Sequence, residues 1–145
     1  YVLSERGFGR GRDLMDVGNF KDVSKYRFEQ AEDDLDTAKL LLEAEKYKAA
    51  NNRAYYACFH AIDAVLALEE IAFKKHKDTL AYFNRQYVHG GDFPDELGHK
   101  IAQLQVIRHK SDYDTFYVAS KKITEMQVQT AEEVISLVGK YLQDN

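Results

Sequence analysis

The chain has 145 residues, of which 45% are hydrophobic, 30% are charged and only one is proline. This composition is typical of a single globular domain with one core, and it excludes an intrinsically disordered chain. The formal net charge of −4 excludes a nucleic-acid binder that works through a basic field over its whole surface, whereas a local basic patch stays open.

Cysteine usage and hydropathy bear on the compartment. Cys58 is the only cysteine, so no disulfide can form within the chain, and we expect a buried, unreactive thiol. No apolar run approaches the roughly 18 residues of a membrane span, and no signal peptide is visible. We therefore expect no membrane contact and a reducing, cytoplasmic setting.

Residues 1–22 carry several glycines and show no helical period. They are interpreted as a flexible N-terminal arm or as an expression remnant, because the chain opens on Tyr1 and Met15 could be a natural start. A competing interpretation is an arginine- and glycine-containing arm that touches RNA. Residues 23–145 are expected to form one helical domain.

Two long helices are predicted first. Apolar residues at spacings of three and four predict a helix from about Ser24, as N-cap, to about Glu45. Its opposite face is expected to be only a solvated surface and carries Glu29, Glu32, Asp33, Asp34, Asp36 and Glu43. After a short link near Lys46, residues 47–70 predict a central helix with an alanine row and an aromatic row.

The central helix also contains polar residues on its apolar surface, namely Asn51, Asn52, Arg53 and His60. Buried polar groups are costly unless they are paired. One interpretation is that Asn51, Asn52 and Arg53 reach solvent near the helix start. The other is that Arg53 and His60, two turns apart on one face, line a polar groove.

Residues 71–91 hold a dense basic cluster, followed by a short helix that ends at Gly90 and Gly91. The cluster comprises Lys74, Lys75, His76 and Lys77. It is either a solvated loop or an edge that contacts phosphates.

A further helix is predicted from about Pro94, with Asp92 as a possible cap and Gly98 at a close crossing, to about Ile107. A last helix is predicted from about Ser120. No strand signal competes, so the fold class is all-α, an up-and-down bundle of four to five helices.

Familiar catalytic signatures are missing. The sequence has no glycine-rich phosphate loop and no zinc or serine-hydrolase motif. Its five histidines do not have the spacing of metal ligands, so we expect no metal and no cofactor.

Residues 108–114 instead place a cation, an imidazole, two carboxylates and a phenol together. The simplest interpretation is a helix C-terminus in which Asp112 pairs with Arg108 at i, i+4.

Together these segments resemble the HEPN domain family of small prokaryotic helical proteins. The resemblance rests on Asn52-Arg53-Ala54-Tyr55-Tyr56-Ala57, Phe59-His60-Ala61, Lys75-His76 and Arg108-x-x-x-Asp112-Tyr113. It implies a helical bundle, a homodimer, and often a toxin paired with a minimal nucleotidyltransferase. Toxins of this family cleave RNA without metal, with an Arg and a His that are separated by four to six residues. Arg108 matches that arginine, but Tyr113, Asp114 and Thr115 stand five, six and seven residues after it, so the His does not carry over.

Three hypotheses follow. The chain binds a nucleotidyltransferase, a nucleotide or RNA through a groove; it is a metal-independent RNase in which His60, His76 or His109 replaces the missing base; or it is a structural dimerisation module. The first is our prediction, with Arg108, Asp112 and Tyr113 as the central residues and a second group for nucleotide or RNA binding: Asn52, Arg53, His60, Lys75 and His76. A phosphate-sized pocket joining both arginines would favour binding, whereas direct arginine–carboxylate pairs would favour a structural role.

Overall fold

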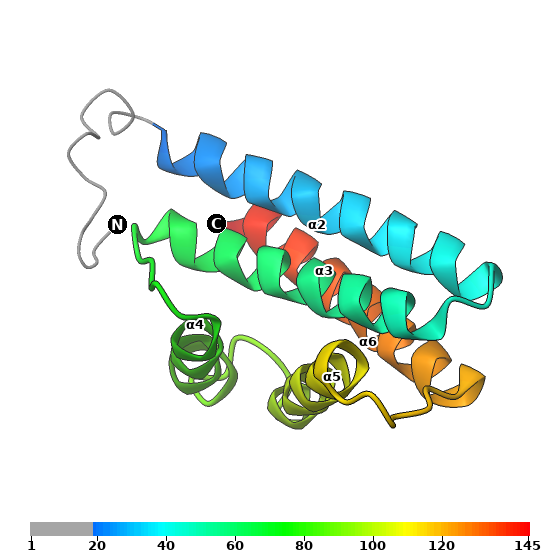
Figure 1. Ribbon diagram of the computed structural model, residues 1–145. Helices are drawn as coiled ribbons and strands as arrows, with labels where there is room; N and C mark the ends of the chain where they lie inside the picture. The colour runs from blue at the N-terminus through cyan, green and yellow to red at the C-terminus, as the bar shows by residue number, and fades with distance from the viewer. Residues whose placement is uncertain (1–18) are drawn as a thin grey trace.

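The computed structural model describes residues 19–145, and this part of the chain is helical without strands. Figure 1 shows that three long helices lie lengthwise beside one another, whereas α4 and α5 are seen nearly end-on and cross beneath α3. The all-α helical bundle is therefore confirmed for the described residues. In chain order the elements are α2 (Phe20–Glu43), α3 (Tyr47–Leu68), α4 (His76–Phe83), the π-helical turn η1 (Asn84–Val88), α5 (Glu96–Tyr113) and α6 (Lys121–Asp144).

The helix α3 is central, as predicted, because it contacts α2, α4, α5 and α6. Its alanine row is completely buried, and such small side chains let neighbouring helices approach closely. Cys58 is buried on the same helix, and burial raises the pKa of its thiol, as expected for an unreactive core cysteine.

The first helix begins earlier than predicted, and Ser24 is not its N-cap. The helix α2 starts at Phe20, where the backbone N–H of Val23 donates to the carbonyl oxygen of Asn19 (2.8 Å). Ser24 is buried, and its hydroxyl donates to the carbonyl oxygen of Ala64 on α3 (2.7 Å). Of the predicted arm, residues 1–18 lie outside the described part of the chain. Residues 20–22, which were also assigned to the arm, form the first turn of α2.

The helix α5 differs from its prediction at both ends. Asp95, not Asp92, occupies its N-cap position, and the helix continues beyond Ile107 to Tyr113. Gly98 makes the predicted close crossing, since a Cβ atom there would lie 2.3 Å from Oδ1 of Asn84 on η1. The extension matters for function, because it places Arg108 and Asp112 on one helix, one turn apart.

The start of α6 is confirmed. Ser120 is its N-cap, and the Ser120 hydroxyl accepts a hydrogen bond from the backbone N–H of Ile123 (3.1 Å). In Figure 1 the helix runs back along α2 and α3, so the C-terminus lies at the end of the bundle where α2 begins.

Candidate functional site

Four cationic or titratable side chains surround the ring of Tyr56, in the middle of α3. The guanidinium carbons of Arg53 and Arg108 lie 5.1 and 5.7 Å from the ring centre. The imidazole rings of His60 and His76 lie 6.1 and 5.7 Å from it. We call these five residues the Tyr56 cluster; it joins α3 to the start of α4 and to α5.

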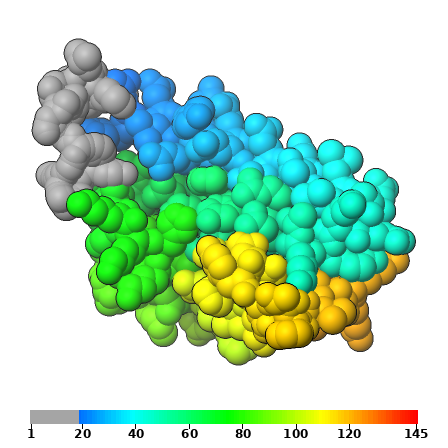
Figure 2. Space-filling model, in the orientation of Figure 1, coloured from blue at the N-terminus to red at the C-terminus, as the bar shows by residue number. Residues whose placement is uncertain are grey.

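Helical spacing explains why the three cluster residues of α3 lie together. Arg53, Tyr56 and His60 are three and four residues apart, so they share one face of α3. Figure 2 shows that α3 stays visible between α2 and the pair α4 and α5 on this side of the molecule. The side chains of Arg53, His60 and Arg108 are 35%, 24% and 15% exposed, so the cluster is partly open to solvent although much of it is shielded from water.

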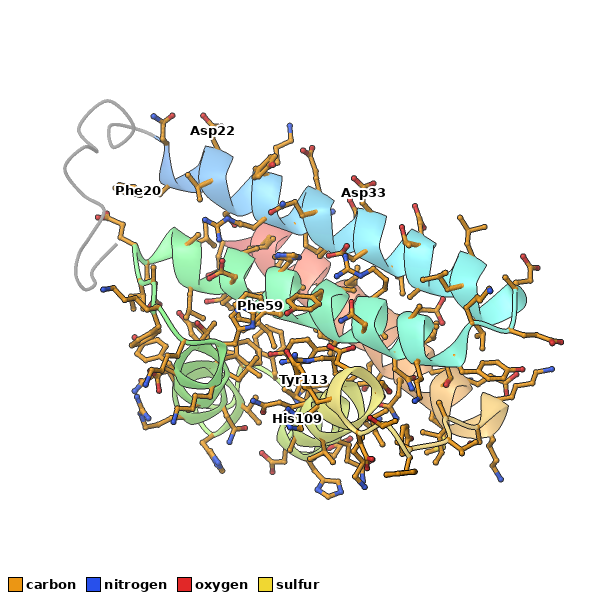
Figure 3. The ribbon with its side chains drawn as sticks, viewed as in Figure 1. Phe20, Asp22, Asp33, Phe59, His109 and Tyr113 are labelled. Atoms are coloured by element: carbon orange, nitrogen blue, oxygen red, sulfur yellow. The ribbon has the colours of Figure 1, made fainter. Side chains whose placement is uncertain are left out.

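Asp34 of α2 holds two members of the cluster, and the prediction that it is merely solvated is wrong. Its Oδ1 atom accepts a hydrogen bond from Nη1 of Arg53 (3.0 Å), and its Oδ2 atom lies 2.8 Å from Nδ1 of His60. Its neighbour Asp33 points away from the bundle in Figure 3. Asp34 lies three residues after Ala31 and four before Ala38, both buried, and this position beside the apolar stripe was the available signal.

Asn52 links the cluster to the end of α5. Its side-chain oxygen accepts hydrogen bonds from Nε and Nη2 of Arg53 (3.0 and 2.8 Å), and its amide nitrogen donates to Oδ2 of Asp112 (2.9 Å). Asp112 also accepts a long hydrogen bond from Nη1 of Arg108 (3.5 Å). Both arginines therefore have the direct carboxylate pairs that a structural network would show.

Three surface pockets of residues 19–145 lie elsewhere, one of them beside Asp36, Leu40 and Lys121. The phosphate-sized pocket that would have favoured binding is therefore not among them. Asn51, which precedes Asn52 on α3, is buried, so the interpretation that it reaches solvent is wrong. Its side-chain amide donates a hydrogen bond to the Ser111 hydroxyl (3.0 Å).

The guanidinium group of Arg108 packs against two tyrosine rings. Its guanidinium carbon lies 4.6 Å from the ring centre of Tyr55, closer than to Tyr56. Burial raises the pKa of the Tyr55 phenol, and the charge of Arg108 offsets part of that rise. Within the described residues, the Nε atom of Arg108 and the Tyr55 hydroxyl are buried without a hydrogen-bond partner. Arg108 therefore keeps donor capacity beyond its contact with Asp112.

His76 is set into aromatic surroundings. Its ring centre lies 4.0 Å from that of Phe59, the labelled residue of α3 in Figure 3. Burial lowers the pKa of His76, and the charge of Arg108 lowers it further. The imidazole is therefore neutral near pH 7 and able to accept a hydrogen bond or a proton.

Two predicted site residues neither belong to the cluster nor form a side-chain hydrogen bond with it among residues 19–145. Lys75 is exposed, as are Lys74 and Lys77, which fits the solvated-loop interpretation of the basic segment. Tyr113 is exposed on α5, where its ring lies 4.9 Å from His109 (Figure 3). The structure thus brings together Asn52, Arg53, His60, His76, Arg108 and Asp112, and it adds Asp34 and Tyr56, which we had not predicted as site residues.

Two further properties hold for residues 19–145. The histidine, cysteine, aspartate and glutamate side chains of this part form no group of three or more arranged to hold a metal ion. Its helices also lack the combination of length and hydropathy that a membrane span requires.

Comparison with known proteins identifies relatives over most of the chain. The HEPN domain model matches residues 24–141. A UPF0332 protein of Thermotoga maritima is 32% identical over 84% of this chain and 92% of its own length. Two proteins of Methanocaldococcus jannaschii, each named a "putative toxin", are 32% and 29% identical, over 80% and 89% of this chain and 86% and 87% of their own lengths.

Proposed function

This chain belongs to the HEPN domain family, and we propose that it works as a toxin-type member that binds single-stranded RNA through the Tyr56 cluster. The names of the two archaeal relatives support the toxin part of the proposal. The resemblance supports a toxin–antitoxin-like pair in which a minimal nucleotidyltransferase is the partner. The RNA part rests on the cluster itself.

The observation that carries the proposal is the placement of two guanidinium groups within 6 Å of one partly exposed tyrosine ring. Proteins bind single-stranded RNA by combining cations that contact phosphates with aromatic rings on which bases stack. Of the five N–H groups of Arg53, three are used by Asp34 and Asn52 in the described residues, so two remain for a phosphate. The net charge of −4 fits a local site better than a basic surface.

The test is titration of a fluorescent single-stranded RNA with the wild-type protein and with Arg108→Gln, by anisotropy in EDTA. We expect the variant to bind roughly tenfold more weakly and with a smaller salt dependence, because one phosphate contact is lost. Arg85→Gln is the matched control, since Arg85 also lies over a tyrosine, 5.6 Å from the ring centre of Tyr82, but outside the cluster.

Circular dichroism must show both variants folded. Absence of RNA binding by the wild-type protein, or equal loss in both variants, would contradict the proposal and favour the structural network described above.

A second candidate function is metal-independent RNA cleavage, because His60 and His76 both lie beside Tyr56 with Arg108. One imidazole would take the 2′-hydroxyl proton as the 2′-oxygen bonds to phosphorus, and the other would protonate the 5′-oxygen as its bond to phosphorus breaks. Arg108 would stabilise the negative charge on the phosphoryl oxygens. His109 is the weakest of the three histidines for this role, because it lies against the exposed Tyr113.

Incubating RNA in EDTA with the wild-type protein and with Arg108→Ala separates binding from cleavage. Fragments that form only with the wild-type protein would establish a ribonuclease. Intact RNA in both reactions would leave a binding protein.

A further inference from the structure

The contacts of Asp34 suggest how the cluster would recognise its ligand, an inference that rests on the proposed RNA binding. We propose that Asp34 is a positioning residue that keeps His60 protonated at Nδ1. The Nε2 atom of His60 then accepts a hydrogen bond from a ribose 2′-hydroxyl, and the site selects RNA over DNA.

The tautomer follows from the chemistry of the partners. An ionised carboxylate only accepts hydrogen bonds, so the 2.8 Å contact between Oδ2 of Asp34 and Nδ1 of His60 requires a proton on Nδ1. In the neutral imidazole the lone pair is then on Nε2, which is directed away from Asp34. His60 therefore presents an acceptor to the side of the ring that the carboxylate does not cover.

The position of Arg53 indicates which ligand atom would meet that acceptor. Arg53 and His60 bind the two oxygens of one carboxylate, so their functional groups lie next to each other. In RNA the 2′-hydroxyl is the neighbour of the 3′-phosphate on the same ribose. A phosphate on the two N–H groups of Arg53 that have no partner among residues 19–145 thus places a 2′-hydroxyl beside His60, while Tyr56 offers its ring to a base.

Selectivity follows because DNA has no hydroxyl at this position. An acceptor that is partly removed from water and left unpaired costs affinity, so we expect RNA to bind roughly tenfold more tightly than an analogue without the donor.

The substitution Asp34→Asn changes the tautomer with little change in shape. Arg53 can only donate, so the single oxygen of Asn at position 34 pairs with Arg53 and the amide NH₂ group faces His60. Nδ1 of His60 must then accept, the proton moves to Nε2, and the acceptor for the 2′-hydroxyl is lost.

The experiment compares oligouridine RNA with its 2′-fluoro analogue, which has no 2′ donor. We expect the wild-type protein to prefer RNA roughly tenfold and Asp34→Asn to bind both about equally. Asp33→Asn, at the neighbouring exposed position, should keep the wild-type ratio.

A second readout needs no RNA. The ¹⁵N NMR shifts of neutral His60, assigned with His60→Gln, should show Nδ1–H in the wild-type protein and Nε2–H in Asp34→Asn. A wild-type protein protonated at Nε2, or one that binds RNA and the fluoro analogue equally, would overturn the inference and leave the RNA binding intact. A protein that shows Nδ1–H but binds neither oligonucleotide would overturn the proposed function, and with it the role of Nε2.

Discussion

At the residue scale, His76 illustrates how packing sets the chemistry of a side chain. In the sequence it is one member of a basic run, between Lys75 and Lys77. In the structure the two lysines stay exposed, while the imidazole lies against the rings of Phe59 and Tyr56. The basic run is therefore not uniform, because its lysine side chains reach into water whereas the shorter histidine packs against aromatic rings and is only partly exposed.

The lowered pKa of His76 predicts a pH dependence of stability. Burial, followed by the charge of Arg108, places the folded pKa below that of the unfolded chain, so the unfolded state binds more protons as the pH falls. The unfolding free energy should therefore decrease between about pH 7 and about pH 5. His76→Gln should lose less stability over this range, as measured by urea denaturation. His99→Gln, at an exposed site on α5, should behave like the wild type; an unchanged slope in His76→Gln would refute the prediction.

At the element scale, the main difference from prediction concerns α5. The change to polar residues after Ile107 suggested a helix end, yet the helix continues to Tyr113. The added turns are held by tertiary contacts: Ser111 receives a hydrogen bond from Asn51, and Asp112 receives one from Asn52. A polar segment remains helical here because its partners come from α3, which no local pattern reveals.

The start of α6, in contrast, depends on a local cap, and it gives the prediction at this scale. Ser120→Ala removes the acceptor for the backbone N–H of Ile123 and should lower the unfolding free energy by about 1 kcal/mol. Ser136→Ala, at an exposed position within the same helix, should be neutral or slightly stabilising. Thermal unfolding of both variants measures the difference, and equal stabilities would show that the cap contributes nothing.

At the scale of the whole molecule, two sets of large apolar residues differ in exposure. Tyr55, Phe83, Tyr87 and Phe93 are buried and fill the core. Tyr113 at the end of α5, and Phe116 and Val118 on the link to α6, are instead 68%, 90% and 84% exposed. Apolar side chains gathered in this way are typical of an interaction surface.

We expect this surface to contribute to the homodimer implied by the resemblance. Sedimentation of the wild-type protein at micromolar concentration should give the dimer mass, and Phe116→Ser should shift it towards the monomer without loss of helicity. Phe73→Ser, 40% exposed on the link before α4, serves as the control. A wild-type monomer would contradict the dimer itself, whereas a dimeric Phe116→Ser variant would contradict only the location of the interface.

The sequence by itself determined that the fold is helical, and it pointed to several residues of the candidate site. Apolar periodicity and the Ser120 cap are local properties, so α3, α6 and the buried stripe of α2 could be read from spacing. The family motifs pointed to Arg53, His60 and Arg108 before any fold was known. Only the tertiary structure decided that these residues meet at Tyr56, that Asp34 binds two of them and that Tyr113 stays outside. The reason is physical: periodicity defines which face of a helix is buried, but the partner of a polar side chain depends on how α2, α4 and α5 pack around α3.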